Sequence, residues 1–84
     1  MEITEAFGVA LKNLRELRCL SQEKLAHTSG LHRTYISLLE RGEKSPSIET
    51  VNKLSKALDV SMSQFFLLTE DVINIGHPDL KRLE

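Results

Sequence analysis

The chain has little of several residue types, and each shortage excludes a class of protein. It holds one cysteine, one tyrosine and no tryptophan in 84 residues. Because the single cysteine, Cys19, has no partner for an internal disulfide, small disulfide-stabilised secreted domains are excluded. No apolar run approaches the roughly 20 residues that span a membrane, and no charged-then-apolar segment of the signal-peptide type is present. We expect one cytoplasmic domain with no membrane partner.

Arrangements typical of enzymes are also missing. The histidines His27, His32 and His77 show no metal-ligand spacing with each other or with Cys19. No nucleophile turn and no glycine-rich phosphate loop accompanies the serine, histidine and aspartate residues. We therefore expect no catalytic activity, no metal site and no cofactor.

No segment shows the alternating pattern of a strand, whereas apolar residues recur at three- and four-residue intervals. The predicted fold is all-α, a compact bundle of five short helices. Ser21, Ser47 and Ser61 are expected N-caps, the last with Gln64 as a capping box, and Gly30 and Gly42 are expected to end helices. The predicted helices lie at about 4–19, 21–28, 32–41, 47–58 and 61–68.

The fourth helix is expected to bury Ile48 together with Val51, Leu54 and Leu58. Beyond Glu70 the pattern weakens, and Gly76-His77-Pro78 stops any helix. Residues 76–84 therefore fit either an ordered dimer element or a loose tail.

Charge is unevenly distributed, although the net charge is only −1. Residues 12–44 hold seven lysines and arginines against four glutamates, and acidic residues are in excess on either side. Since a local field steers a charged partner more than the net charge does, this segment is compatible with a polyanion such as DNA. Ordinary solvated helix faces would give the same pattern, so charge alone does not decide.

The third predicted helix has two different faces at about 100° per residue. One face is apolar and carries Tyr35, Ile36 and Leu39. The other presents hydrogen-bonding side chains, with one leucine at its edge: Arg33, Thr34, Ser37, Leu38 and Arg41. A short helix anchored by one face and polar on the other fits the DNA major groove, although any surface helix has a polar face.

The segment from Ser21 to Gly42 carries a set of residues at fixed spacing: Gln22, Leu25-Ala26, Ser29-Gly30-Leu31, Tyr35-Ile36-Ser37 and Glu40-Arg41-Gly42. On these residues it resembles the helix-turn-helix of the phage-repressor-like, or xenobiotic response element, family of bacterial regulators, with a lambda-repressor-like fold. The resemblance covers residues 7–66, and the turn, core and exposed positions agree simultaneously. Departures are Ser29, where the family often has alanine, and His32, where a better N-cap is common.

The resemblance implies roles for individual residues. Arg33, Thr34, Ser37 and Leu38 are expected to face base edges, while Arg15 and Glu40 are expected to form a structural ion pair. Leu38 packing on the fourth helix, and a core role for Tyr35, remain alternatives. The expected phosphate contacts are Ser21, Gln22, His32, Tyr35, Arg41 and Lys44.

The function implied is sequence-specific transcriptional regulation by a homodimer on a pseudo-palindromic operator, with helix 32–41 in the major groove. Within the family, the length and the run Arg33-Thr34-Tyr35-Ile36-Ser37 look like restriction–modification controller proteins, and small prophage regulators are built similarly. The alternative is an antitoxin-like or adaptor module whose main partner is a protein.

We expect residues 1–69 to form the DNA-binding domain and residues 70–84 a C-terminal extension that joins the dimer interface. The pattern Phe65-Phe66-Leu67-Leu68 offers more apolar surface than one face of a short helix can bury. These apolar residues could instead complete the core of the monomer. The expected interface residues are Phe66, Leu67, Val72, Ile73 and Ile75.

Overall fold

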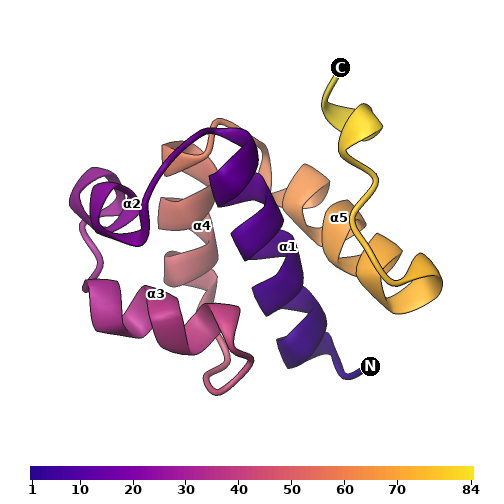
Figure 1. Ribbon diagram of the computed structural model, residues 1–84, viewed down its shortest axis with the longest axis horizontal. Helices are drawn as coiled ribbons and strands as arrows, with labels where there is room; N and C mark the ends of the chain where they lie inside the picture. The colour runs from indigo at the N-terminus through magenta and orange to yellow at the C-terminus, as the bar shows by residue number, and fades with distance from the viewer.

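The computed structural model describes residues 1–84 and contains five α-helices, a short C-terminal 3₁₀ helix and no strand (Figure 1). The prediction of an all-α fold with five helices is confirmed. No helix combines enough length with enough apolar character to cross a lipid bilayer. The elements are α1 (Ile3–Leu17), α2 (Gln22–Ser29), α3 (Arg33–Glu40), α4 (Ile48–Ala57), α5 (Met62–Ile75) and η1 (Leu80–Leu83).

Serine side chains start three of the helices. Ser21 Oγ accepts a hydrogen bond from the Lys24 amide at 3.0 Å, which satisfies a free N–H in the first turn of α2. Ser47 and Ser61 do the same for α4 and α5, and Ser61 forms a capping box with Gln64. In contrast, the His32 side chain makes no capping hydrogen bond at the start of α3.

Glycines with a left-handed backbone end α2 and follow α3. Gly30 has φ of 76° and Gly42 has φ of 73°, a region that side chains with a Cβ rarely adopt. The chain therefore reverses sharply after each of these helices. As a result α3 crosses α2 at an angle and lies on the outside of the molecule (Figure 1).

Helix α1 lies between α3 and α5 and contacts both of them (Figure 1). The rings of Phe7 and Phe65 stack between α1 and α5, with centroids 4.6 Å apart and planes only 4° from parallel. All five helices contribute to one core of fifteen buried apolar residues, with Leu25 from α2 and Ile36 and Leu39 from α3. The helix-turn-helix is therefore fixed to the body of the molecule through its apolar face.

Helix α5 is longer than the sequence pattern predicted, because its polar residues find partners inside the protein. Buried Thr69 donates from Oγ1 to the Phe65 carbonyl at 2.9 Å. Asp71 accepts from both Nε and a terminal nitrogen of Arg82, at 2.8 and 2.7 Å. This ion pair holds the C-terminal segment against α5, and Leu80 and Leu83 pack on the core. Residues 76–84 therefore pack against the body of the molecule in this structure.

Two burial predictions were wrong. Val72 was expected at a dimer interface, but it is 1% exposed and belongs to the monomer core, since α5 continues through it and turns it inward. Ile48 was expected in the core, but it is 79% exposed. It is the first residue of α4, and the buried stripe of that helix begins only at Thr50 and Val51.

Candidate nucleic-acid interface

The outer surface of α3 carries the predicted base-reading side chains. Arg33 and Thr34 are exposed, and Ser37 and Leu38 are partly exposed, whereas Ile36 and Leu39 are fully buried beneath them. A face of this kind offers guanidinium and hydroxyl groups for base edges and one aliphatic side chain for a thymine methyl group. The structure therefore brings all four predicted residues to one side of one helix.

The turn before α3 is fixed by a side chain as well as by Gly30. Ser29, which is buried, donates from Oγ to the Ala26 carbonyl at 3.4 Å and accepts from the Leu31 amide at 3.4 Å. An alanine could form neither bond. The serine thus adds local hydrogen bonds to the reversal that sets the direction of α3.

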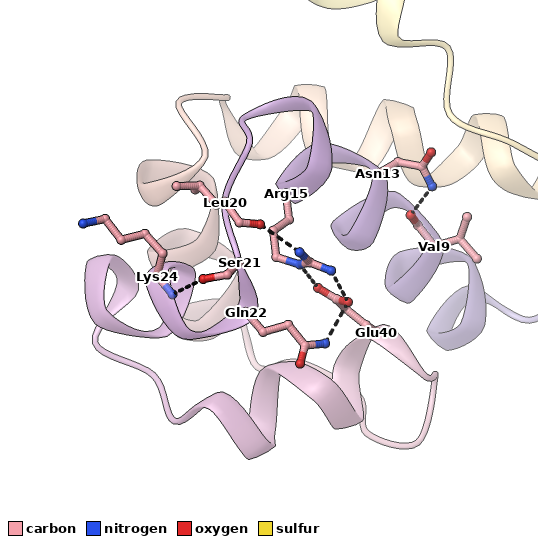
Figure 2. Close-up of polar contacts among 8 residues, drawn as sticks. All are labelled: Val9, Asn13, Arg15, Leu20, Ser21, Gln22, Lys24 and Glu40. Atoms are coloured by element: carbon pink, nitrogen blue, oxygen red, sulfur yellow. Dashed lines mark hydrogen bonds and ion pairs between the residues drawn. The ribbon is translucent and has the colours of Figure 1, made fainter.

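A buried ion pair joins α1 to the end of α3. Arg15 donates from Nε to Glu40 Oε2 at 2.6 Å and from a terminal nitrogen to Oε1 at 3.1 Å (Figure 2). The side chains are only 12% and 4% exposed. The hydrogen bond to Glu40 raises the pKa of Arg15 above its usual value, so the guanidinium stays charged. The other terminal nitrogen of Arg15 donates to the Leu20 carbonyl, before α2.

Gln22 completes this group from the first residue of α2. Its Nε2 donates to Glu40 Oε1 at 3.1 Å, so one carboxylate receives hydrogen bonds from α1 and from α2 (Figure 2). Gln22 was predicted as a phosphate contact. In the free protein one of its two amide protons is used by Glu40, and the other remains for a ligand.

Gly8 is a further structural residue of the site, which the sequence reasoning missed. A Cβ built on Gly8 would lie 2.4 Å from the Leu39 carbonyl oxygen and 2.7 Å from that of Glu40. The backbone of α1 therefore approaches the last turn of α3 more closely than any side chain would allow. The available signal was a glycine inside an otherwise regular helical pattern.

Tyr35 connects α3 to α4. Its hydroxyl lies 3.2 Å from Thr50 Oγ1, which also accepts from Ser47 Oγ at 3.1 Å. The ring packs against the core. The hydroxyl of Tyr35 therefore has a protein partner in the free molecule, and Thr50 is a second residue that sequence reasoning did not identify.

The remaining predicted phosphate contacts lie around α3 on the surface. His32 and Lys44 are exposed at opposite ends of the helix, and Ser21 is exposed at the start of α2. Arg41 pairs with Glu43 at 2.9 Å, with both side chains largely in solvent. Such a pair is weak in water and leaves the arginine available to a stronger anion. No group of three histidine, cysteine or acidic side chains is placed to hold a metal ion.

This geometry is that of a known DNA-binding motif: a short helix, a glycine turn, and a second helix that is anchored on one face and polar on the other. A family model described as "HTH_3: Helix-turn-helix" matches residues 11–65. The chain belongs to this helix-turn-helix family. The family is one of transcriptional regulators.

Similar proteins include two control proteins. The chain is 44% identical over 62 residues to control protein C.SmaI of Serratia marcescens, and this alignment covers 74% of each of the two chains. It is 39% identical over 77 residues to control protein C.BamHI of Bacillus amyloliquefaciens, and this alignment covers 90% of each of the two chains.

Solved structures of controller proteins share the fold. The crystal structure of C.AhdI from Aeromonas hydrophila has a TM-score of 0.73 and 41% identity, over 75% of this chain and 96% of that one. The structure of C.Esp1396I bound to a 25 base pair operator site has a TM-score of 0.80 and 31% identity, over 88% of this chain and 97% of that one.

Proposed function

We propose that this protein is a sequence-specific DNA-binding regulator of transcription that places α3 in the major groove. The observation that carries the proposal is the exposed polar face of α3. The opposite face of this helix is buried, and the side chain of its last residue, Glu40, is held by Arg15 and Gln22. A reading element held in this way loses little freedom when it binds, which favours recognition of particular bases. A DNA partner implies that the protein works in the cytoplasm.

The roles of the side chains follow from their chemistry and position. Arg33 can donate two parallel hydrogen bonds to guanine O6 and N7, worth about 1–3 kcal/mol of discrimination. Thr34 and Ser37 can hydrogen-bond to several base edges, and Leu38 can contact a thymine methyl group. Contacts to phosphate from Ser21, Gln22, His32, Tyr35, Arg41 and Lys44 would set orientation and affinity without reading sequence.

A symmetric dimer through α5 is part of the proposal. Phe66, Leu67, Ile73 and Ile75 are large apolar residues of this helix that are between 40% and 57% exposed. Beside Phe66 an apolar groove of about 210 Å³, lined also by Ile3 and Ile48, offers space for side chains of a second copy. Unlike Val72, these residues are available for a partner.

The size of the molecule agrees with this arrangement. Helices α2 and α3 lie on one side of α1 and α5 lies on the other (Figure 1). The longest dimension of the molecule is 30 Å. Two copies joined through α5 would each place α3 on the outside of the dimer. A dimer needs this placement to reach two half-sites about 34 Å apart in the major groove.

We further propose that the protein controls a restriction–modification operon, because the chain aligns over most of its length with the restriction–modification controller protein C.AhdI and with two control proteins. The solved structure of one controller protein with this fold, C.Esp1396I, has it bound to an operator site. An adaptor or antitoxin-like module would need an observation that favours a protein ligand over DNA, and neither the α3 surface nor these relatives supplies one.

Selection of random duplex DNA by the purified protein, followed by sequencing of the retained molecules, tests the proposal. We expect enrichment of a two-fold symmetric site and an affinity that falls steeply with salt because phosphate contacts release counterions. Retention without a shared sequence, or no retention, would contradict it and favour the adaptor alternative.

A further inference from the structure

An ion pair across the helix-turn-helix turn involves the main predicted base-reading residue. Nε of Arg33, the first residue of α3, lies 4.0 Å from Oε1 of Glu23 in the first turn of α2. The side chains are 59% and 82% exposed, so both lie on the surface of the molecule.

Helix electrostatics explain why Arg33 has a partner from the neighbouring helix. A cation at a helix N-terminus faces the positive end of the helix dipole, which is unfavourable. The first turn of α3 contains no acidic residue and its N-cap makes no side-chain bond. Glu23, itself favourably placed in the first turn of α2, supplies a negative charge close to this end of α3.

We infer that Glu23 is a positioning residue that makes Arg33 discriminate between base pairs. The inference rests on the proposed function, in which Arg33 reads a guanine. Glu23 lies on the Nε side of the guanidinium, which leaves the two terminal nitrogens free as a fork. That fork matches the O6 and N7 acceptors of guanine in the major groove. When DNA excludes water, the Glu23–Arg33 attraction strengthens and holds the fork in this orientation.

The same carboxylate also weakens incorrect complexes. If Arg33 turns away from Glu23 toward a phosphate, Glu23 faces the negative charge of DNA without a partner. A sequence that lets Arg33 keep both Glu23 and a guanine avoids this repulsion, and other sequences do not. Specificity is a difference of affinities, and an uncompensated charge in the wrong complex increases that difference.

The test compares Glu23→Gln, Arg33→Ala and the double variant of the full chain on the duplex that the wild type selects. Each is titrated at fixed salt against that duplex, against versions with a single base pair changed, and against a scrambled duplex. Glu43→Gln is the matched control, because it also removes one negative charge from an exposed ion pair beside α3, the pair of Glu43 with Arg41. Circular dichroism melts establish that each variant is folded.

We expect Glu23→Gln to lower discrimination at the base pair read by Arg33 by about fivefold, the upper range for an exposed ion pair. It should have no such effect when Arg33 is already alanine, and Glu43→Gln should tighten binding to all duplexes alike. Equal tightening of all duplexes by Glu23→Gln, or an unchanged effect without Arg33, would overturn the inference but leave the role of Arg33 intact. If Arg33→Ala changes no base preference, the proposed role of Arg33 fails as well.

Discussion

The α-carbon of Gly8 lies so close to Leu39 that a methyl group added to it would meet the Leu39 carbonyl oxygen at 2.4 Å. The approach is between two backbones, so no side chain can move aside to make room. It fixes the distance between α1 and the end of the recognition helix. The Arg15–Glu40–Gln22 hydrogen bonds are made beside this approach, by residues of α1, α2 and α3.

Gly8→Ala should therefore destabilise the protein, although alanine is the better helix former. We expect a loss of about 1–3 kcal/mol in the free energy of unfolding, as for other overpacked sites. Urea denaturation followed by circular dichroism measures it. Lys12→Ala, at an exposed position of the same helix, should stay within about 0.5 kcal/mol of wild type. A Gly8→Ala protein as stable as wild type would show that α1 and α3 can separate without cost.

Removing Arg15 should leave a buried charge without its main partner. We expect Arg15→Ala to lower the free energy of unfolding by about 3–5 kcal/mol, because the Glu40 side chain is only 4% exposed. Glu40→Gln in the same protein should recover part of that loss, since the neutral amide is easier to bury. Denaturant unfolding of the two single variants and the double variant measures the coupling; strictly additive losses would mean that the pair does not act as a unit.

Phe66→Glu should give a folded monomer that binds a symmetric site weakly. A charge on this exposed apolar surface is tolerated in the monomer but not in an apolar interface. Sedimentation equilibrium combined with circular dichroism checks both properties. Val72→Glu should instead unfold the protein, because Val72 is in the core. A Phe66→Glu variant that remains dimeric would place the interface elsewhere.

The C-terminal segment should loosen in acid. Hydrogen bonds from Arg82, opposed by burial and assisted by the Asp79 amide, lower the pKa of Asp71 below its ordinary value of 3.8. A lowered pKa in the folded state gives stability that is complete above the unfolded pKa and is lost as pH falls through the folded pKa. The stability difference between wild type and Arg82→Gln should therefore be constant above about pH 5 and shrink below about pH 4.

Thermal melts of these two proteins from pH 7 to pH 2.5 measure that difference. The comparison removes the contributions of the other carboxyl groups, which both proteins share. A difference that does not change with pH would show that Asp71 and Arg82 are not paired in solution.

Local signals predicted the parts of the fold that depend on neighbouring residues. Ser21, Ser47 and Ser61 cap helices as expected, because capping needs only an oxygen three residues before an amide. Gly30 reverses the chain because glycine adopts a positive φ without a Cβ clash, which also depends only on the residue itself. The outward face of α3 followed from its periodicity, with Ile36 and Leu39 on the buried side.

Features that depend on distant residues were not predictable. The tight approach of Gly8 depends on Leu39 and Glu40 of α3, more than thirty positions away. Val72 is buried because α5 continues through it and packs it against the core. The exposure of Ile48 depends on where the core ends. The hydrogen bond of the Tyr35 hydroxyl to Thr50 depends on where α4 begins. The hydrophobic periodicity of a segment predicts a helix and its buried face, but it does not show which other helix packs against that face.

The most direct test of the central claim is to map the DNA-binding surface residue by residue. Backbone amide spectra of the isotope-labelled protein, recorded by nuclear magnetic resonance as the selected duplex is added, identify the perturbed residues. We predict the largest changes at residues 21–22, 32–41 and 44, with little change in η1. Changes concentrated on α5 or the C-terminal segment, with α3 unaffected, would contradict the assignment of α3 as the recognition helix.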